Sequence, residues 1–171
     1  MQRIFLIGYM GSGKSAMGRL LAKSLGLQFY DLDSYIEGKY YLTIAQIFDQ
    51  QGEESFREKE RLCLHELSEI EDVVIATGGG APCFFDNMDF MNQKGHTLYL
   101  DLSVSQLQAR LESSRAGVRP LLKDKSSWEL QDYIEENLRK RMPFYSQAKH
   151  HISGSDEEIT AKIKAFSPPS L

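Results

Sequence analysis

The sequence predicts an α/β protein in which a parallel sheet carries helices on both faces. Short apolar runs alternate along the chain with stretches of helical periodicity, and this alternation is typical of a parallel sheet. A glycine-rich segment between the first run and the first helical stretch adds a phosphate-binding loop to that fold. The strands are expected at 3–7, 27–30, 73–76, 97–100 and, as the weakest of them, 150–152.

Several of the intervening helices have a sequence motif that marks their N-terminus. A serine or threonine followed three residues later by glutamine or glutamate is the spacing of a capping box, in which each residue bonds the other's backbone. Four helix starts show this spacing: Thr43/Gln46, Ser103/Gln106, Ser126/Glu129 and Ser155/Glu158.

The glycine-rich segment Gly8-Tyr9-Met10-Gly11-Ser12-Gly13-Lys14-Ser15 fits the motif G-x-x-x-x-G-K-[ST]. Glycine lets successive backbone N–H groups turn inward toward a phosphate, and the N-terminus of the next helix adds partial positive charge. Lys14 would reach the β- and γ-phosphates, and the Ser15 hydroxyl would ligate Mg²⁺. The expected nucleotide-binding residues are Gly11, Ser12, Gly13, Lys14, Ser15 and Ala16.

The same letters also permit a dinucleotide-binding loop. Gly11-x-Gly13-x-x-Ala16 fits G-x-G-x-x-[GA], and Asp31 lies 20 residues after Gly11, where an acid would bind a ribose. Lys14 and Ser15 argue against this alternative, because nucleoside triphosphate chemistry uses a lysine and a hydroxyl there and a dinucleotide loop uses neither. The P-loop interpretation is therefore preferred.

Composition weighs against several other classes of protein. The net charge of the 171-residue chain is −4, whereas a nucleic-acid binder usually shows a basic excess. The length and the 42% hydrophobic content fit one globular domain over 1–171. No apolar run has the length of a membrane span or the form of a signal peptide, so a cytoplasmic chain without a membrane partner is expected. Cys63 and Cys83 fit no metal spacing and are expected to be free thiols.

Two carboxylates follow the second apolar run. Asp31 and Asp33 stand at the carboxyl end of an expected strand, where open parallel sheets bind their ligands. Because side chains two apart on an extended chain point the same way, one could serve the metal and the other a substrate hydroxyl. The alternative is that Asp33 or Ser34 caps the next helix. The third run lacks the aspartate that many P-loop proteins use for Mg²⁺, which makes Asp31 the natural substitute.

Two further features suit a small anionic ligand. Gly78, Gly79 and Gly80 follow the third run, and three glycines there favour close approach of a ligand over a flexible turn. Arg57 and Glu60 are three apart on an expected helix. Spacing alone favours a solvated helix face for this pair, but burial beside the site would let Glu60 hold the Arg57 fork for a carboxylate.

The segment 113–124 is polar, contains a glycine and carries Arg115 and Arg119. It has the character of a lid whose arginine could close over a γ-phosphate, although a plain basic surface loop fits equally well. The helix that follows reaches Arg141-Met142-Pro143-Phe144-Tyr145, and Pro143 is expected to bend or end it.

In their order along almost the whole chain, these segments resemble the shikimate kinases. The resemblance rests on the P-loop at 8–15, Asp-Leu-Asp at 31–33, Phe-Arg-Glu-Lys-Glu at 56–60, Gly-Gly-Gly at 78–80, Arg-Pro-Leu-Leu at 119–122 and Arg-Met-Pro-Phe-Tyr at 141–145. It implies a three-layer P-loop kinase fold like that of nucleoside monophosphate kinases. The implied parallel sheet has five strands in the order 2-3-1-4-5, with a lid near 113–124 and a substrate-binding region near 33–61.

The resemblance also implies an activity, the transfer of the ATP γ-phosphate to the 3-hydroxyl of shikimate in aromatic amino-acid biosynthesis. Shikimate and ATP would be the small-molecule partners and Mg²⁺ the cofactor. The implied catalytic residues are Lys14, Asp33 and Arg119; Lys14 and Arg119 would also bind ATP phosphates. The implied substrate-binding residues are Asp33, Arg57, Gly78, Gly79, Gly80 and Arg141, and the implied metal residues are Ser15 and Asp31, the latter directly or through water.

The residue chemistry agrees with this implication, since two arginines suit a carboxylate and an aspartate suits paired hydroxyls. Two other functions stay open at this point. A gluconate-type sugar-acid kinase would share the fold, although Arg57, the glycine triplet and Arg141 weigh against it. A nucleotide-binding module without catalysis would need the P-loop but no clamp for an acid. A monomer is the expected form.

Overall fold

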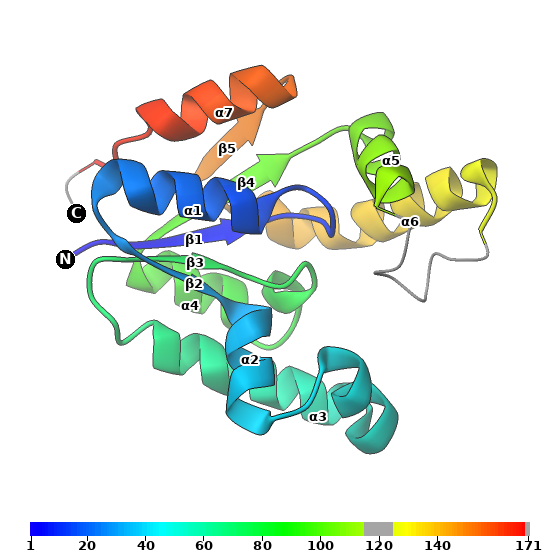
Figure 1. Ribbon diagram of the computed structural model, residues 1–171, viewed down its shortest axis with the longest axis horizontal. Helices are drawn as coiled ribbons and strands as arrows, with labels where there is room; N and C mark the ends of the chain where they lie inside the picture. The colour runs from blue at the N-terminus through cyan, green and yellow to red at the C-terminus, as the bar shows by residue number, and fades with distance from the viewer. Residues whose placement is uncertain (115–124, 170–171) are drawn as a thin grey trace.

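The structure is a computed structural model that describes residues 1–114 and 125–169 (Figure 1). Its strands are β1 (Arg3–Ile7), β2 (Gln28–Asp31), β3 (Val73–Ala76), β4 (His96–Asp101) and β5 (His150–Ser153). Its helices are α1 (Lys14–Leu25), α2 (Leu32–Tyr40), α3 (Ile44–Leu67), the short 3₁₀ helix η1 (Ala81–Cys83), α4 (Asn87–Lys94), α5 (Val104–Ser113), α6 (Ser127–Tyr145) and α7 (Asp156–Ala165). Each expected apolar run forms a strand whose bounds lie within one residue of the prediction.

The five strands are parallel and lie in the order β2-β3-β1-β4-β5, which confirms the predicted fold class and strand order. β1 occupies the centre, where Phe5 pairs with Ile75 of β3 and with Thr97 of β4. Because neighbouring strands run in the same direction, the carboxyl ends of β1, β2 and β3 share one edge of the sheet. The P-loop, Asp31 and the glycine triplet all begin at that edge.

Helices cover both faces of the sheet (Figure 1). α1 packs against β1, β2 and β3 and against α7, while α4 packs against β4. The central strands are apolar at almost every position, and β3 is buried along its whole length, as expected for a sheet covered on both sides. α2 and α3 pack on each other and extend beyond the β2 edge.

The four capping boxes predicted from the sequence are all present at helix N-termini. Both halves of the capping box form at Thr43, Ser103, Ser126 and Ser155. The helix was expected to bend or end at Pro143; it does not end there, because α6 continues through this proline to Tyr145. Arg141 and Tyr145 therefore lie one turn apart on the same face of α6.

Residues 115–124, which include Arg115, Arg119 and most of the expected lid, lie outside the described residues. Cys63 and Cys83 are free thiols, as predicted. Within 1–114 and 125–169, no helix combines the length and the apolar character that crossing a membrane requires.

Candidate active site

β1 delivers the chain to the P-loop at the carboxyl edge of the sheet. Gly11 and Gly13 have φ angles of 79° and 89°, a region that residues with a Cβ atom rarely adopt, so the loop conformation depends on glycine at both positions. Gly13 is also the N-cap of α1, and no side chain caps that end of the helix. The first N–H groups of α1 have no intrahelical partner and can therefore donate to an anion.

Lys14 lies against the loop that precedes it. Its Nζ donates hydrogen bonds to the carbonyl oxygens of Gly8 and Tyr9, at 2.8 and 2.9 Å. These bonds hold the ammonium group at the wall of the pocket that Lys14 lines. Ser12 does not line the pocket, although Gly11 and Gly13 do. Its side chain is buried, and its N–H donates to the Tyr9 carbonyl oxygen at 3.1 Å.

Asp31 links the P-loop to the end of β2. Its Oδ2 accepts a hydrogen bond from the Ser15 hydroxyl, and its Oδ1 accepts one from the backbone N–H of Ser34 at 3.1 Å. Asp31 is thus the N-cap of α2, and the alternative in which Asp33 or Ser34 caps this helix is wrong. The extended geometry expected for 31–33 is also wrong, since β2 ends at Asp31 and Asp33 lies in the first turn of α2. Both carboxylates nevertheless line one pocket.

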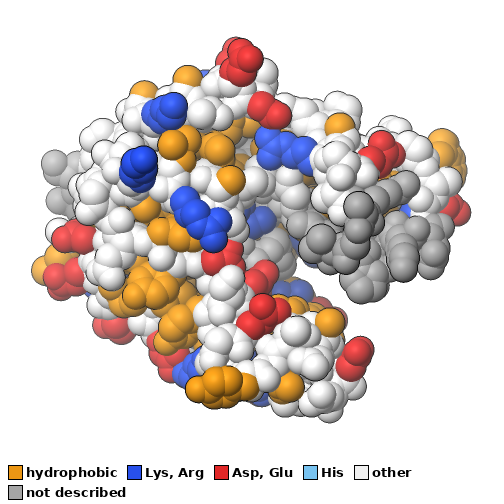
Figure 2. Space-filling view, viewed as in Figure 1, with side chains coloured by type: hydrophobic (Ala, Val, Ile, Leu, Met, Phe, Trp, Pro, Cys, Tyr) orange, Lys and Arg blue, Asp and Glu red, His pale blue; other side chains and the backbone are white. Residues whose placement is uncertain are grey.

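That pocket has a volume of about 350 Å³. Figure 2 shows the molecule hollowed beside the part that contains α2 and α3, with acidic and basic side chains close together along the hollow. The pocket brings the P-loop, both aspartates and the start of the glycine triplet to one place. Its lining residues are Met10, Gly11, Gly13, Lys14, Ser15, Ala16, Asp31, Asp33, Thr77, Gly78, Gly79, Arg110 and Ser114.

The glycine triplet is packed closely by charged side chains. A Cβ atom on Gly78 would lie 2.9 Å from Glu60 Oε1, and one on Gly80 would lie 2.7 Å from Arg57 Nη2. A Cβ atom on Gly79 would lie 3.2 Å from an Arg141 guanidinium nitrogen. None of the three has a positive φ angle, so these positions need glycine for space rather than for backbone conformation. Arg57, Gly80 and Arg141 adjoin the pocket through this triplet and are not among its lining residues.

Arg57 and Glu60 form a buried ion pair on α3. Arg57 Nη1 donates to Glu60 Oε2 at 2.8 Å, and the two side chains are 12% and 1% exposed. The solvated face that spacing alone favoured is therefore wrong. The Arg57 guanidinium also lies 4.0 Å from the centroid of the Phe84 ring. Its buried Nε has no hydrogen-bond partner among the described residues.

Arg141 reaches the triplet from α6. Its guanidinium carbon lies 5.2 Å from the centroid of the Tyr9 ring, within the range of a cation–π contact. Tyr9 belongs to the P-loop, so this contact ties the second arginine to the phosphate-binding segment. Two guanidinium groups from different helices thus meet at consecutive glycines, and each can offer a planar fork to a carboxylate.

The charges of the two regions influence each other. Burial raises the pKa of Asp33, nearby Asp31 raises it further, and Lys14 and Arg57 oppose the shift. Burial likewise raises the pKa of Glu60 to about 7, against the opposing effect of Arg57. The glycine triplet connects the two regions, because a Cβ atom on Gly79 would lie 3.2 Å both from an Arg141 guanidinium nitrogen and from the backbone nitrogen of Met10 in the P-loop.

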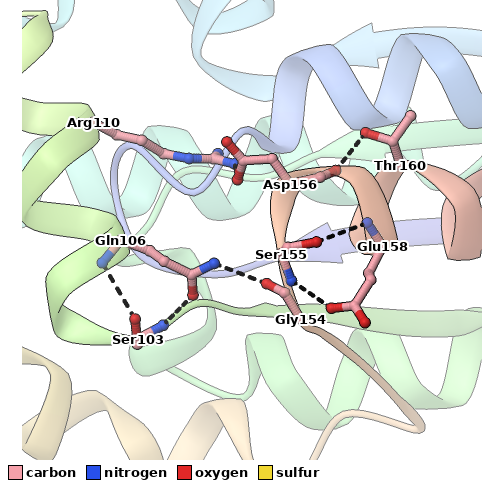
Figure 3. A network of polar contacts seen from close by, with 8 residues as sticks. All are labelled: Ser103, Gln106, Arg110, Gly154, Ser155, Asp156, Glu158 and Thr160. Atoms are coloured by element: carbon pink, nitrogen blue, oxygen red, sulfur yellow. Dashed lines mark hydrogen bonds and ion pairs between the residues drawn. The ribbon is translucent and has the colours of Figure 1, made fainter.

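One basic residue of the pocket was missed from the sequence. Arg110 of α5 forms an ion pair with Asp156 at the start of α7 (Figure 3). A Cβ atom on Gly13 would lie 2.8 Å from Arg110 Nη1, so the guanidinium covers the P-loop. Next to it, Gln106 Nε2 donates to the Gly154 carbonyl oxygen at 2.8 Å and ties α5 to the loop after β5 (Figure 3). A single arginine on a helix face carries no sequence signal for this position.

Comparison with known proteins identifies the family. The family model for shikimate kinase matches residues 10–166. The chain belongs to the shikimate kinase family. It is 57% identical to a shikimate kinase from Parabacteroides distasonis over 148 residues, which cover 86% of this chain and 85% of that one.

Solved shikimate kinase structures agree with the same assignment. The crystal structure from Bacteroides thetaiotaomicron is 44% identical, with a TM-score of 0.89 over 95% of this chain and 94% of that one. The structure from Acinetobacter baumannii in complex with shikimate is 34% identical, with a TM-score of 0.85 over 96% of this chain and 89% of that one. These matches confirm the predicted family and, with it, an ATP-dependent kinase.

The buried Glu60 predicts a dependence of stability on pH. Because its pKa rises from 4.5 to about 7 on folding, the stability that this group contributes is fully present below pH 4.5 and is lost as pH rises through about 7. Glu60→Gln removes the titration, so the free energy of unfolding of the wild type should fall relative to that of the variant between pH 5 and pH 8. Urea denaturation of both proteins across this range measures the difference; a constant difference would contradict the raised pKa.

Proposed function

We propose that this chain transfers the γ-phosphate of ATP to the 3-hydroxyl of shikimate, giving shikimate 3-phosphate and ADP. One observation carries the proposal: Asp33 lines the pocket together with Lys14, and a Cβ atom on Gly78 would lie 3.1 Å from Asp33 Oδ1 and 2.9 Å from Oε1 of Glu60, the partner of Arg57. Phosphoryl transfer depends mainly on positioning and on stabilisation of charge. A site that holds an anionic acceptor beside the terminal phosphate supplies both.

The P-loop would hold the nucleotide. The N–H groups at the start of α1, the Lys14 ammonium and the Arg110 guanidinium would face the phosphates, with Lys14 beside the transferred group. Gly11, Gly13 and Ala16 line this part of the pocket, and Ser12 stays a predicted contact although its side chain is buried. Arg119 lies outside the described residues and is retained as a catalytic residue because it belongs to the motif Arg-Pro-Leu-Leu.

The residues Ser15 and Asp31 fit a magnesium ion. A hydroxyl and a carboxylate that already share a hydrogen bond at the pocket wall are oxygen ligands of the type Mg²⁺ prefers. Mg²⁺ usually takes only one or two protein ligands beside substrate phosphates, and these two residues match that number. When bound, the ion would neutralise charge on the β- and γ-phosphates.

The two arginines would grip the carboxylate of shikimate. Arg57 is already oriented by Glu60 and by the Phe84 ring, and Arg141 is held over the Tyr9 ring. Because these groups are fixed before the substrate arrives, little side-chain entropy is lost on binding. Gly78, Gly79 and Gly80 would let the acceptor approach the backbone between the arginines and Asp33.

Asp33 would orient the 3-hydroxyl and accept its proton as the hydroxyl oxygen attacks the γ-phosphorus and ADP leaves. A carboxylate whose pKa is raised by burial is a better proton acceptor than an exposed aspartate. The same carboxylate can accept hydrogen bonds from two neighbouring hydroxyls of the substrate. Monomeric state and a single domain over 1–171 stay predictions from the sequence.

The function is tested by measuring ADP release with shikimate and with gluconate side by side. We expect turnover with shikimate and little with gluconate, because the paired arginines and the glycine triplet fit a compact cyclic acid. Turnover with gluconate alone would replace the proposal by a sugar-acid kinase. ATP binding by calorimetry with no turnover of either acid would indicate a nucleotide-binding module.

Arg57→Lys should raise the Michaelis constant for shikimate by about tenfold or more, because an ammonium group cannot reproduce the paired hydrogen bonds of a guanidinium. The Michaelis constant for ATP should change little. Arg61→Lys is the matched control: Arg61 lies one turn further along α3 and pairs with Asp86 at 2.8 Å on the surface. Equal constants in wild type and Arg57→Lys would remove Arg57 from the acid site.

Asp33→Asn should lower kcat by about 10²-fold or more, the usual loss when a proton-transfer group is removed. ATP affinity, measured by calorimetry, should stay close to that of the wild type. Asp89→Asn is a suitable control, since Asp89 is an exposed aspartate in the first turn of α4, as Asp33 is in α2. A loss of ATP affinity as large as the loss of kcat would place Asp33 in the metal site instead.

A further inference from the structure

Tyr145 is a buried tyrosine that the proposed reaction leaves without a role. Its hydroxyl donates a hydrogen bond to the carbonyl oxygen of Gly79 at 2.6 Å. Its side chain is fully buried, and its ring stacks on the Tyr99 ring with the centroids 5.0 Å apart. A phenylalanine could fill the same space and make the same stacking contact, so packing alone does not explain the hydroxyl.

The hydrogen bond to Gly79 fixes one peptide group of the glycine triplet. The Gly79 carbonyl and the Gly80 N–H belong to the same planar unit and point in opposite directions across it. Holding the carbonyl toward Tyr145 therefore aims the Gly80 N–H away from α6. Glycine without such a tie would be the most mobile residue type at this edge of the sheet, because it has the widest choice of backbone angles.

The same hydroxyl lies beside the second arginine. Arg141 is one turn before Tyr145 on α6, and its guanidinium interacts with the Tyr145 oxygen. Burial raises the pKa of Tyr145, and the nearby Arg141 opposes this shift only in part. The hydroxyl therefore keeps its proton at working pH. That single proton is given to Gly79, and a Cβ atom on the same glycine would lie 3.2 Å from an Arg141 guanidinium nitrogen, so the Tyr145 hydroxyl and the Arg141 guanidinium meet at Gly79.

We propose that Tyr145 is a positioning residue for the acid-binding half of the site, where its hydroxyl fixes both the Gly79–Gly80 peptide and the Arg141 guanidinium. It contacts no reacting atom and acts through these two groups. The inference rests on the proposed function for the identity of the acid, shikimate. It adds a residue from α6 that couples the glycine triplet to one of the two arginines.

The geometry around Tyr145 separates this role from a structural one. Its ring is clamped against Tyr99 of β4, so the hydroxyl is held in place by packing that does not depend on the hydrogen bond. Arg141 has a second support in the Tyr9 ring. Loss of the hydroxyl should therefore loosen the peptide and the guanidinium without removing either from the site.

The test compares Tyr145→Phe with Tyr99→Phe. Tyr99 is the matched control, because it is 1% exposed, belongs to the same stacked pair and carries its hydroxyl beside Asp101 rather than beside the triplet. We expect Tyr145→Phe to raise the Michaelis constant for shikimate by about 3- to 10-fold, the size of one net hydrogen bond. The Michaelis constant for ATP should stay within about twofold in both variants, and Tyr99→Phe should leave the constant for shikimate unchanged.

A second measurement follows the peptide itself. With ¹⁵N-labelled glycine, the amide signal of Gly80 should shift or broaden in Tyr145→Phe and stay in place in Tyr99→Phe. An unchanged Michaelis constant for shikimate, an equal rise for ATP, or an equal rise in Tyr99→Phe would overturn the inference. If the wild type fails to phosphorylate shikimate, the proposed function falls, and the Gly80 signal alone then decides whether Tyr145 fixes the peptide.

Discussion

The buried ion pair between Arg57 and Glu60 is the interaction on which the proposed acid-binding half of the site depends. Two charges are removed from water there, and the low polarity of the site raises the pKa of Glu60 to about 7. Removing one partner of such a pair typically costs about 3–5 kcal/mol, because the other charge stays buried. The pair also accounts for the lack of a side chain at two of the three glycines, since a Cβ atom at position 78 or 80 would lie within 3 Å of one of its partners. Compared with apolar residues of similar volume, a buried ion pair often contributes no net stability, so this pair is better explained by the fixed orientation that it gives to Arg57.

The sheet supplies the second constraint. The carboxyl ends of parallel strands lie at one edge of the sheet. The segments that follow β1, β2 and β3 at this edge are the P-loop, Asp31 with Asp33, and the glycine triplet. α3 and α6 then bring one arginine each to that edge from different parts of the chain. The proposed phosphate-binding and acid-binding residues are therefore neighbours because of the sheet topology, and the Arg57–Glu60 pair fixes the orientation of one of the two arginines. Asp33 is placed where both sets of charges act on it.

Sequence patterns predicted the strands, the strand order through family resemblance, the four capping boxes and the family itself, because each depends on local spacing or on motifs in order. Burial was harder to predict. Arg57 and Glu60 have the spacing of an ordinary surface pair, and their burial depends on tertiary contacts such as those with Gly78, Gly80 and Phe84. Arg110 was missed for a similar reason, since a lone arginine on a helix carries no pattern, and Tyr145 belongs to the segment 141–145 that carries the resemblance but had no predicted role. Pro143 does not end α6, because a proline in the last turn of a helix removes only one helical hydrogen bond, so the helix can continue past it.

The central claim is that nucleotide and acid occupy one crevice, and paramagnetic relaxation tests it most directly. With ADP and Mn²⁺ in place of Mg²⁺, the protons of added shikimate should relax much faster in the presence of the protein, because the effect falls steeply with distance from the metal. The enhancement should disappear in Lys14→Ala if nucleotide binding is lost. Shikimate that binds with normal affinity but shows no enhanced relaxation would place the two ligands in separate sites and contradict the account.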